Sequence, residues 1–275
     1  MQLRDIPGPG ALGGGRRRFA ELLYLIAVTD FKKTYFGTVF GYLWSLARPL
    51  MLFGVLLIVF TQVFRLGSDV AHYPVLLLFN IVLFSFFQEA TGAAVGSIVA
   101  QESVVRKTQF PRLVIPLSVV LTSLFQLVLN LVAVLVFLLA FGVAPRWSWL
   151  GFPLLLGALI VLTTAVSMIV SSLFPRFRDM AIIWTVVSAV LFYASPVLYP
   201  IDKVPSDLRG VFLINPFAPL LELARKWVID PDAPGPVAVA GGRLQLLAPV
   251  AVYLGTCWLA AWLFRREAPR IAEAL

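Results

Sequence analysis

Six long apolar runs set what this chain can fold into. They cover residues 44–64, 73–96, 113–141, 150–174, 180–199 and 244–264. About 20 apolar residues in a helix that rises 1.5 Å per residue cross a hydrocarbon layer of roughly 30 Å. Each run is long enough to be a membrane-spanning helix. The sequence therefore predicts an all-α integral membrane protein with six transmembrane helices.

The composition agrees with the membrane class. Of the 275 residues, 60% are hydrophobic and only 13% are charged, a balance that a soluble domain does not show. The net charge of +8 does not indicate a nucleic-acid partner, because the basic residues lie between apolar runs, where they act as topology signals and headgroup contacts. The single cysteine, Cys257, excludes an internal disulfide and a CxxC pair. With one histidine in addition, we expect no metal site.

The distribution of Lys and Arg predicts the orientation. With the N terminus inside, 15 of the 22 basic residues fall in inward-facing segments and 7 in outward-facing ones, mostly in one long loop. Short cytoplasmic segments carry the excess of positive charge in membrane proteins. Both termini are therefore predicted to be cytoplasmic, and we expect no cleavable signal peptide.

The N-terminal region before the first apolar run divides into two parts. Residues 1–18 are Gly-rich and basic and are predicted to be disordered, whereas residues 19–36 repeat apolar side chains at helical spacing. Such a helix lies along the inner membrane surface instead of crossing it. It either guides anionic headgroups to a lateral opening or is an ordinary anchor. The headgroup candidates are Lys32, Lys33, Tyr35 and Arg48. Residues 37–275 are predicted to form the transmembrane domain.

The stretch "QESVVRKTQFPRLVIPLS", residues 101–118, joins the second and third runs. A charged side chain at mid-bilayer costs about 2.5–3.5 kcal/mol on insertion scales, so this charged stretch is predicted to be cytoplasmic. Residues 98–108 suit a short helix, and Pro111 disfavours helix at the residue before it. A short charged helix here either transmits force from a partner below or only fixes the topology.

Three motifs together carry a family resemblance. "VVRKTQFPRLVIPLS", the earlier "DFKKTYFGTVFGYLWSLARPL" and the later "ASPVLYPIDKVPSDLRGVFLINPFAPLLELARKW" make the chain resemble, from about Phe19 to Phe264, the membrane subunit of ABC-2 type exporters. The resemblance is to the polysaccharide and polyol-phosphate export permeases that handle O-antigen and teichoic acid. The Gly-rich N terminus and "DPDAPGPVAVAGGR" depart from the pattern.

This resemblance implies a function and partners. The subunit would form a homodimer, pair with two copies of an ABC ATPase in the bacterial inner membrane, and export a polyprenyl-diphosphate-linked glycan. Residues 101–109 would be the coupling helix on the ATPase, with the contact candidates Glu102, Ser103, Val104, Arg106 and Lys107. An ABC-2 permease for a drug or small lipid is the alternative within the family.

The chain carries no ATPase signature of its own. A P-loop needs a Lys directly after Gly, and none of the five lysines follows a glycine. ATP and magnesium are therefore expected on a partner, and this chain is expected to bind no cofactor. An enzyme acting on lipid-linked sugars is a weaker alternative. Its candidate acids lie in a proline-rich loop without a neighbouring histidine: Asp202, Asp207, Asp230 and Asp232.

The loop of residues 199–244 combines prolines with short amphipathic stretches. We expect two short re-entrant helices before the last span, because irregular backbone at membrane depth is tolerated where protein or a cavity surrounds it. They would form an outer gate with Pro196, Tyr199, Asn215 and Pro216. The alternative is a surface loop that only covers the bundle.

A glycan needs a lined path, because a hydroxyl moved into hydrocarbon without a partner costs about 4–8 kcal/mol. Aromatic faces suit sugar surfaces, and the candidates are Phe84, Phe87, Trp184, Phe192 and Tyr193; ordinary packing is the alternative for each. Glu89 is the one acid well inside a run. It either lines the path or holds two helices together.

Overall fold

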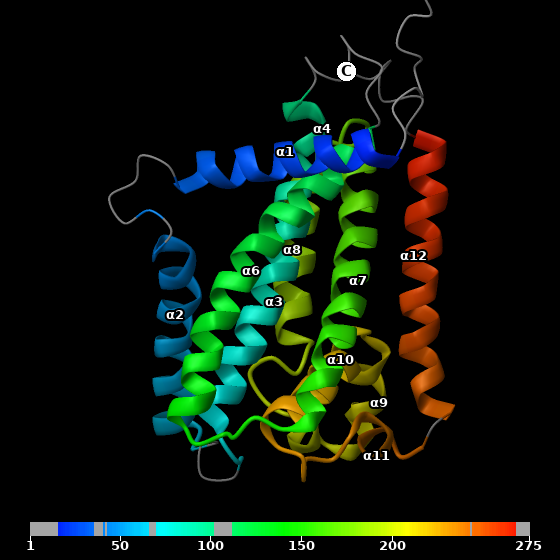
Figure 1. The fold of residues 1–275 in the computed structure, drawn as a ribbon. Coiled ribbons are helices and arrows are strands. Elements are labelled where there is room, and N and C mark those ends of the chain that lie inside the picture. Colours follow the sequence, from blue (N-terminus) through cyan, green and yellow to red (C-terminus); the bar gives the residue numbers. More distant parts are fainter. Residues whose placement is uncertain are drawn as a thin grey trace, which may run out of the picture.

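The computed structural model describes residues 16–35, 41, 43–65, 70–101, 112–242 and 244–267. Every regular element in these residues is helical, which confirms the predicted all-α class for this part of the chain. The long helices stand side by side in a bundle, and α1 (Arg16–Tyr35) lies crosswise over one end of it (Figure 1). We call this end the α1 end and the opposite one the loop end.

Within the described residues, five helical segments are long and apolar enough to cross a membrane. They are Leu43–Val63, Tyr73–Val95, Val114–Ala140, Trp147–Leu173 and Leu244–Glu267. Their main helices are α2 (Leu43–Ile58), α3 (Tyr73–Val95), α6 (Val114–Ala140), α7 (Phe152–Leu173) and α12 (Leu247–Glu267). Short π-helical or 3-10 turns extend α2, α7 and α12. These segments match five of the six predicted runs.

The fifth predicted run, residues 180–199, forms a shorter helix than expected. Helix α8 (Met180–Tyr193) has 14 residues, which at 1.5 Å per residue gives about 21 Å, less than the hydrocarbon thickness of roughly 30 Å. The sequence predicted this helix to continue to residue 199. It ends earlier because Pro196 disfavours helix at the residue before it and has no N–H to donate. Residues 194–200 continue as turns and bends.

Helix α1 occupies the place of the helix predicted for residues 19–36. It begins at Arg16, so residues 16–18, which were predicted to be part of a disordered tail, belong to the helix. One of its faces packs on α6. There Ala27 is buried, its carbonyl accepts a hydrogen bond of 3.2 Å from Thr122 Oγ1, and Phe31 meets Phe125 edge to face at 5.6 Å. The opposite face, with Lys32 and Lys33, is exposed. The helix is therefore attached to the bundle by its apolar side.

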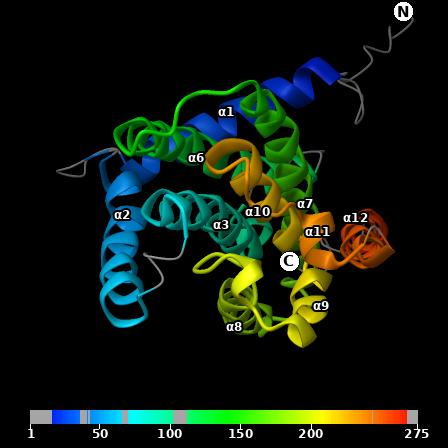
Figure 2. The ribbon, with the colours of Figure 1, turned by 90° about the horizontal axis from the view of Figure 1, so that it is seen from below.

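Helix α3 is the centre of the bundle. It contacts α2, α6, α7 and α8, and the view from the loop end shows it among these helices (Figure 2). Phe79, Phe84 and Phe87 on it are almost fully buried. Helix α12, by contrast, packs mainly on α7 and on the short helix α9 (Ser206–Ile214) and exposes Trp258. An all-round apolar helix is typical of the interior of a bundle, and α3 fits that description.

The loop end is closed by short helices. These are α9 (Ser206–Ile214), α10 (Phe217–Ala224) and α11 (Pro236–Ala240), with a π-helical turn, Arg225–Ile229, after α10. Ile201, Leu213 and Ala218 form a small core among them. Two short helices were predicted in this loop, and α9 and α10 occupy that place. At the α1 end, α3 is followed by the single turn α4 (Ser97–Ala100).

Candidate functional site

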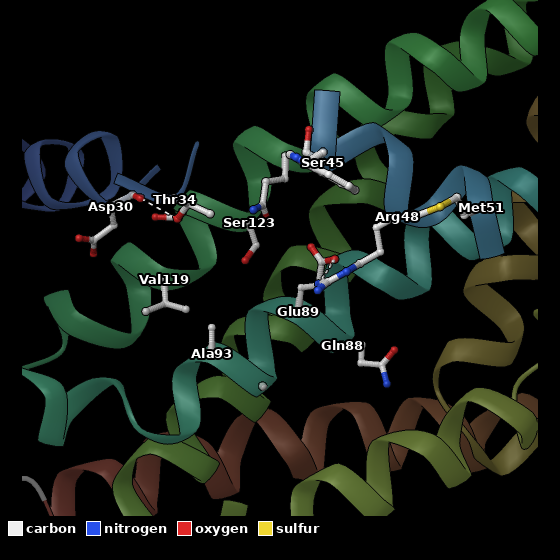
Figure 3. Close-up of a pocket in the computed structure, with 14 residues that line it drawn as sticks. Asp30, Thr34, Ser45, Arg48, Met51, Gln88, Glu89, Ala93, Val119 and Ser123 are labelled. Carbon is white, nitrogen blue, oxygen red and sulfur yellow. Dashed lines mark hydrogen bonds and ion pairs between the residues drawn. The ribbon is translucent and has the colours of Figure 1, made fainter. Parts of the chain in front are cut away.

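A pocket of about 820 Å³ lies near the α1 end, among α1, α2, α3 and α6 (Figure 3). Its lining combines polar and apolar side chains. The lining residues are Asp30, Thr34, Trp44, Ser45, Arg48, Met51, Gln88, Glu89, Gly92, Ala93, Val119, Thr122, Ser123 and Gln126. Ligand sites typically combine a largely apolar surface with a few placed polar groups, so this pocket is the leading candidate for a binding site.

An ion pair between two helices lies at the pocket. Arg48 Nη1 on α2 is 3.7 Å from Glu89 Oε1 on α3 (Figure 3). The Arg48 side chain is 80% exposed and that of Glu89 34%. A guanidinium has five N–H donors in a fixed fork, so an Arg48 paired with one carboxylate oxygen retains donors for an anionic group. The Glu89 carboxylate orients this cation at the pocket.

Helices α1 and α6 supply hydroxyl and amide groups to the same pocket. Thr34 Oγ1 donates to the Asp30 carbonyl at 2.9 Å on α1, and Thr122 Oγ1 donates to the Ser118 carbonyl at 2.9 Å on α6. Ser123 follows Thr122 directly, and Gln126 lies one turn further along α6. The pocket therefore offers groups suited to a polar molecule, beside the exposed apolar face of α2.

The structure places the predicted headgroup and coupling residues as follows. Arg48 lines the pocket, while Lys32 and Lys33 lie exposed on the last turn of α1. The side chain of Tyr35 lies outside the described residues. So do the coupling candidates Glu102, Ser103, Val104, Arg106 and Lys107, which follow Gln101 at the α1 end. The roles of all of them remain predictions.

The predicted aromatic path residues gather away from the pocket, between α3, α8 and α10. Ring centroids are 5.3 Å apart for Phe84 and Phe192 and 6.0 Å apart for Phe87 and Trp184. Phe217 of α10 completes the cluster at 4.6 Å from Phe87. The crossed ring geometry is the one that aromatic pairs prefer. Tyr193 is 66% exposed and meets Phe192 at 5.2 Å. Whether any of these rings contacts a substrate remains a prediction.

The predicted gate residues come together around Ser195. Asn215 Nδ2 donates to Ser195 Oγ at 2.7 Å, and Asn215 Oδ1 accepts from the Phe217 N–H at 3.0 Å at the start of α10. Pro216 lies between Asn215 and Phe217. Tyr199 donates its hydroxyl proton to the Tyr193 carbonyl at 2.9 Å. The end of α8 and the turn between α9 and α10 are thus joined by side chains.

Sequence reasoning missed two α3 side chains that bind the chain after α8. Asn80 Nδ2 donates to the Pro196 carbonyl at 3.1 Å and the Val197 carbonyl at 3.4 Å. The Tyr73 hydroxyl donates to the Leu198 carbonyl at 2.8 Å. A lone Asn inside the apolar run of residues 73–87 was the available signal, since a polar side chain inside a membrane usually has a protein partner.

A buried charge cluster at the loop end was also missed. Arg225 Nη1 lies 2.7 Å from Asp202 Oδ1 and 3.6 Å from Glu222 Oε2, and Glu222 Oε1 accepts from the Ile201 N–H at 2.8 Å. Glu222 is 2% exposed. Burial raises the pKa of Glu222 to about 7, although the Ile201 N–H and the Arg225 cation act in the opposite direction. Two charged side chains of the loop, Glu222 and Arg225, are thus buried.

Among the described residues, no three His, Cys, Asp or Glu side chains gather into a group that could hold a metal ion.

A bundle of long apolar helices, an amphipathic helix across its end and a mixed polar and apolar pocket define an integral membrane protein of the multi-pass transporter class. Residues 21–228 match the ABC-2 type transporter family. The chain belongs to this family, as the sequence motifs indicated. It is the membrane subunit of a transporter, not an enzyme, and its family implies an ABC ATPase as the partner.

The chain is similar to proteins named for the export of O-antigen and the transport of polysialic acid. The chain is 31% identical over 202 residues to an O-antigen export system permease protein RfbA of Klebsiella pneumoniae, covering 73% of this chain and 77% of that one. It is 27% identical over 263 residues to the protein of the same name from Myxococcus xanthus, covering 94% and 96%. It is 26% identical over 235 residues to the polysialic acid transport protein KpsM of Escherichia coli, covering 83% and 87%.

Proposed function

We propose that this chain is the membrane subunit of an ATP-driven exporter that moves a lipid-linked polysaccharide from the cytoplasmic to the outer side of the bacterial inner membrane. The names of the relatives support this substrate class. The observation that carries the proposal is the pocket of about 820 Å³ with the Arg48–Glu89 pair at its wall. It provides a cation and hydroxyl groups at the edge of an apolar bundle.

The chemistry of the pocket suits the head of a polyprenyl-diphosphate-linked glycan. A guanidinium binds phosphate oxygens with two parallel hydrogen bonds, and Arg48 is exposed enough to make them. Sugar hydroxyls find partners in Gln88, Ser123 and Gln126. The lipid tail remains in the bilayer along the apolar face of α2, where Val55 and Ile58 are exposed. The polar head thus enters the protein while the tail remains in lipid.

Two features support the membrane placement in this proposal. Helix α1 lies crosswise to the bundle with its lysines exposed, as a helix on the inner surface would. The distribution of Lys and Arg along the sequence supports cytoplasmic termini. The proposal takes helix α8 with residues 194–200, most of which are buried, as the sixth crossing, and takes α9 and α10 as helices that re-enter the outer leaflet.

The assembly in this proposal contains two permease chains and two ATPases. Residues 102–107 follow α3 and α4 at the α1 end, where a cytoplasmic ATPase binding ATP and magnesium would dock. Helix α8 carries exposed apolar side chains, among them Ile182, Val186 and Val190. A second permease chain packed against this helix would enclose the path between the two chains.

The proposal is tested in vesicles that contain the permease and its ATPase partner. Arg48→Gln removes the cation at the pocket, and we expect export of the lipid-linked glycan to fall at least tenfold while assembly with the ATPase is unchanged. The matched control is Arg146→Gln, which removes an exposed arginine at the loop end. ATP hydrolysis stimulated by a small hydrophobic drug, and not by the glycolipid, would instead assign the chain to drug or small-lipid transport.

A further inference from the structure

The non-helical stretch after α8 is buried. Ser195, Val197 and Leu198 are at most 4% exposed, and Ile201 is fully covered. The last helical hydrogen bond of α8 runs from the Ala194 N–H to the Val190 carbonyl at 2.8 Å. The carbonyls that follow have left the helix and need other donors, because buried carbonyls without a donor destabilise the fold.

Helix α3 supplies donors to three consecutive carbonyls of this stretch. Asn80 donates to the carbonyls of Pro196 and Val197, and Tyr73 donates to that of Leu198. The two donors are seven residues apart, which is close to two helical turns, so they lie on one face of α3. A single helix face therefore holds the main chain of residues 196–198.

The same helix also holds α10. Asn215 links Ser195 to the first N–H of α10 through hydrogen bonds of 2.7 and 3.0 Å. Phe217 at the start of α10 packs on Phe84 and Phe87 of α3, at 5.3 and 4.6 Å between ring centroids. Four side chains of α3 thus contact the segment from Ser195 to Phe217: Tyr73 and Asn80 through hydrogen bonds, and Phe84 and Phe87 through ring contacts. We call residues 195–200 and 215–217 the gate segment.

The other end of α3 lies at the α1 end of the bundle. Helix α3 runs without an interior proline from Tyr73 to Val95, since Pro74 lies in its first turn, where it is compatible with a helix. Its 23 residues make a rod of about 35 Å. One continuous helix therefore joins the α1 end to the side chains that hold the gate segment.

We propose that Tyr73 and Asn80 are positioning residues that make the gate segment move with α3, so that nucleotide-driven motion at the α1 end opens or closes the loop end. This inference rests on the proposed function, because it assumes an ATPase partner at the α1 end. Under this inference, the hydrogen bonds of Tyr73 and Asn80 connect α3 to the gate segment. The Asn80 amide is then required for coupling between ATP hydrolysis and movement of the gate segment.

The test uses the full transporter with its ATPase in vesicles, in a background where Cys257→Ser removes the single cysteine. Val197→Cys then places one thiol in the gate segment, and a membrane-impermeant maleimide added outside measures its accessibility. We expect the labelling rate in this background to change at least fivefold when the ATPase is trapped with nucleotide. Export per ATP hydrolysed is measured on the same vesicles.

Two variants remove the donors, and one matched control removes a similar donor elsewhere. Tyr73→Phe deletes only a hydroxyl, and Asn80→Leu deletes the amide. Tyr253→Phe deletes a hydroxyl that donates to the Ala158 carbonyl at 2.9 Å, between α12 and α7. In the first two, we expect labelling to become independent of nucleotide and export per ATP to fall at least fivefold, with ATP hydrolysis retained. Tyr253→Phe should show the same labelling and the same export per ATP as the background. Asn80→Gln keeps the amide donors and should therefore lose less export per ATP than Asn80→Leu.

Nucleotide-dependent labelling and normal export per ATP in both Tyr73→Phe and Asn80→Leu would overturn the inference. If Asn80→Leu does not assemble, Tyr73→Phe decides alone, because its ring remains in place. The proposed function fails separately: a background transporter that exports no lipid-linked glycan refutes that function, whereas labelling still reports whether the gate segment follows α3.

Discussion

The carboxylate of Glu89 lies 3.7 Å from the guanidinium of Arg48 and joins α3 to α2 beside the pocket. The sequence suggested a headgroup contact for Arg48 and either a path or a packing role for Glu89. In the structure, the two charges form one unit at the wall of the pocket. A pair exposed to this degree contributes little to stability, in general about 0–1 kcal/mol, so its effect should be sought in substrate binding.

Glu89→Gln should strengthen binding of an anionic substrate. The change removes a negative charge from the pocket, keeps the side-chain volume and leaves Arg48 without its carboxylate partner. We expect the glycolipid concentration for half-maximal ATPase stimulation to fall about three- to tenfold, which corresponds to roughly 0.7–1.4 kcal/mol. Asp207→Asn, at an exposed acid on α9, is the control. An unchanged half-maximal concentration in Glu89→Gln would argue against an anionic group at this pocket.

Gly151 is required for packing between the α6–α7 connection and the π-helical turn. A Cβ atom at Gly151 would lie 2.7 Å from Cε3 of Trp227, while the neighbouring Ser148 and Trp149 side chains donate to the Trp227 and Val228 carbonyls at 2.6 and 2.9 Å. We expect Gly151→Ala to destabilise the protein by about 1–3 kcal/mol through overpacking.

The measurement for Gly151→Ala is thermal unfolding of the purified permease in detergent. Gly157→Ala is its matched control, because it lies inside α7 with no atom within 4 Å of the added Cβ. There alanine should be neutral or stabilising by up to about 1 kcal/mol. Equal unfolding temperatures for the two variants would contradict the steric role of Trp227.

Glu222 should make stability depend on pH. Its pKa is about 7 in the folded chain, above its ordinary value of 4.5, so the folded state binds this proton more tightly. The stabilisation from this group is complete below about pH 4.5 and is lost as the pH rises through about 7. We expect the unfolding temperature to fall from pH 5 to pH 8, because the free energy of unfolding decreases by at most about 1.4 kcal/mol per pH unit.

Glu222→Gln isolates this contribution. The glutamine retains an oxygen that can accept from the Ile201 N–H but does not titrate. The decrease between pH 5 and pH 8 should become shallower in this variant, whereas Asp207→Asn should follow the wild type. A slope that is the same in Glu222→Gln and in the wild type would show that other groups set the pH dependence.

Lys32 and Lys33 should make transport depend on anionic lipid. Both are exposed on the last turn of α1, and a basic residue near an anionic surface contributes about 1 kcal/mol. The double variant Lys32→Gln with Lys33→Gln should lose most of the increase in export that anionic lipid produces in vesicles. Arg146→Gln, with a basic residue removed at the other end, should respond to anionic lipid as the wild type does. An unaltered response of the double variant would leave α1 as an ordinary anchor.

The sequence predicted those elements that depend on local pattern. Apolar length located five spans, and helical spacing located α1. It overestimated α8, because residues 194–200 are themselves mostly apolar. A count of apolar residues does not detect that Pro196 ends the helix or that Asn80 replaces the lost hydrogen bonds.

The parts of the site that the sequence did not predict depend on tertiary contacts. Arg48 and Glu89 are 41 positions apart in the sequence, and no periodicity relates them. The sequence placed Asp202 in the proline-rich loop without pairing it with a cation, yet its partner Arg225 is 5% exposed and lies 2.7 Å from it. Burial of such a pair is decided by the chain around it, which a single sequence does not show.

The enclosed position of α3 has a consequence for how the protein is made. Its hydropathy is the lowest among the five long spans, and it carries Asn80 and Glu89. During synthesis it emerges before α6, α7 and α8, the neighbours that later surround it. A nascent α3 would expose the amide of Asn80 without a partner, because the Pro196 and Val197 carbonyls follow α8, whereas Arg48, the partner of Glu89, is already present on α2. Its stable residence in the bilayer therefore awaits the arrival of the later helices, so that insertion and assembly of this subunit are a single, late event.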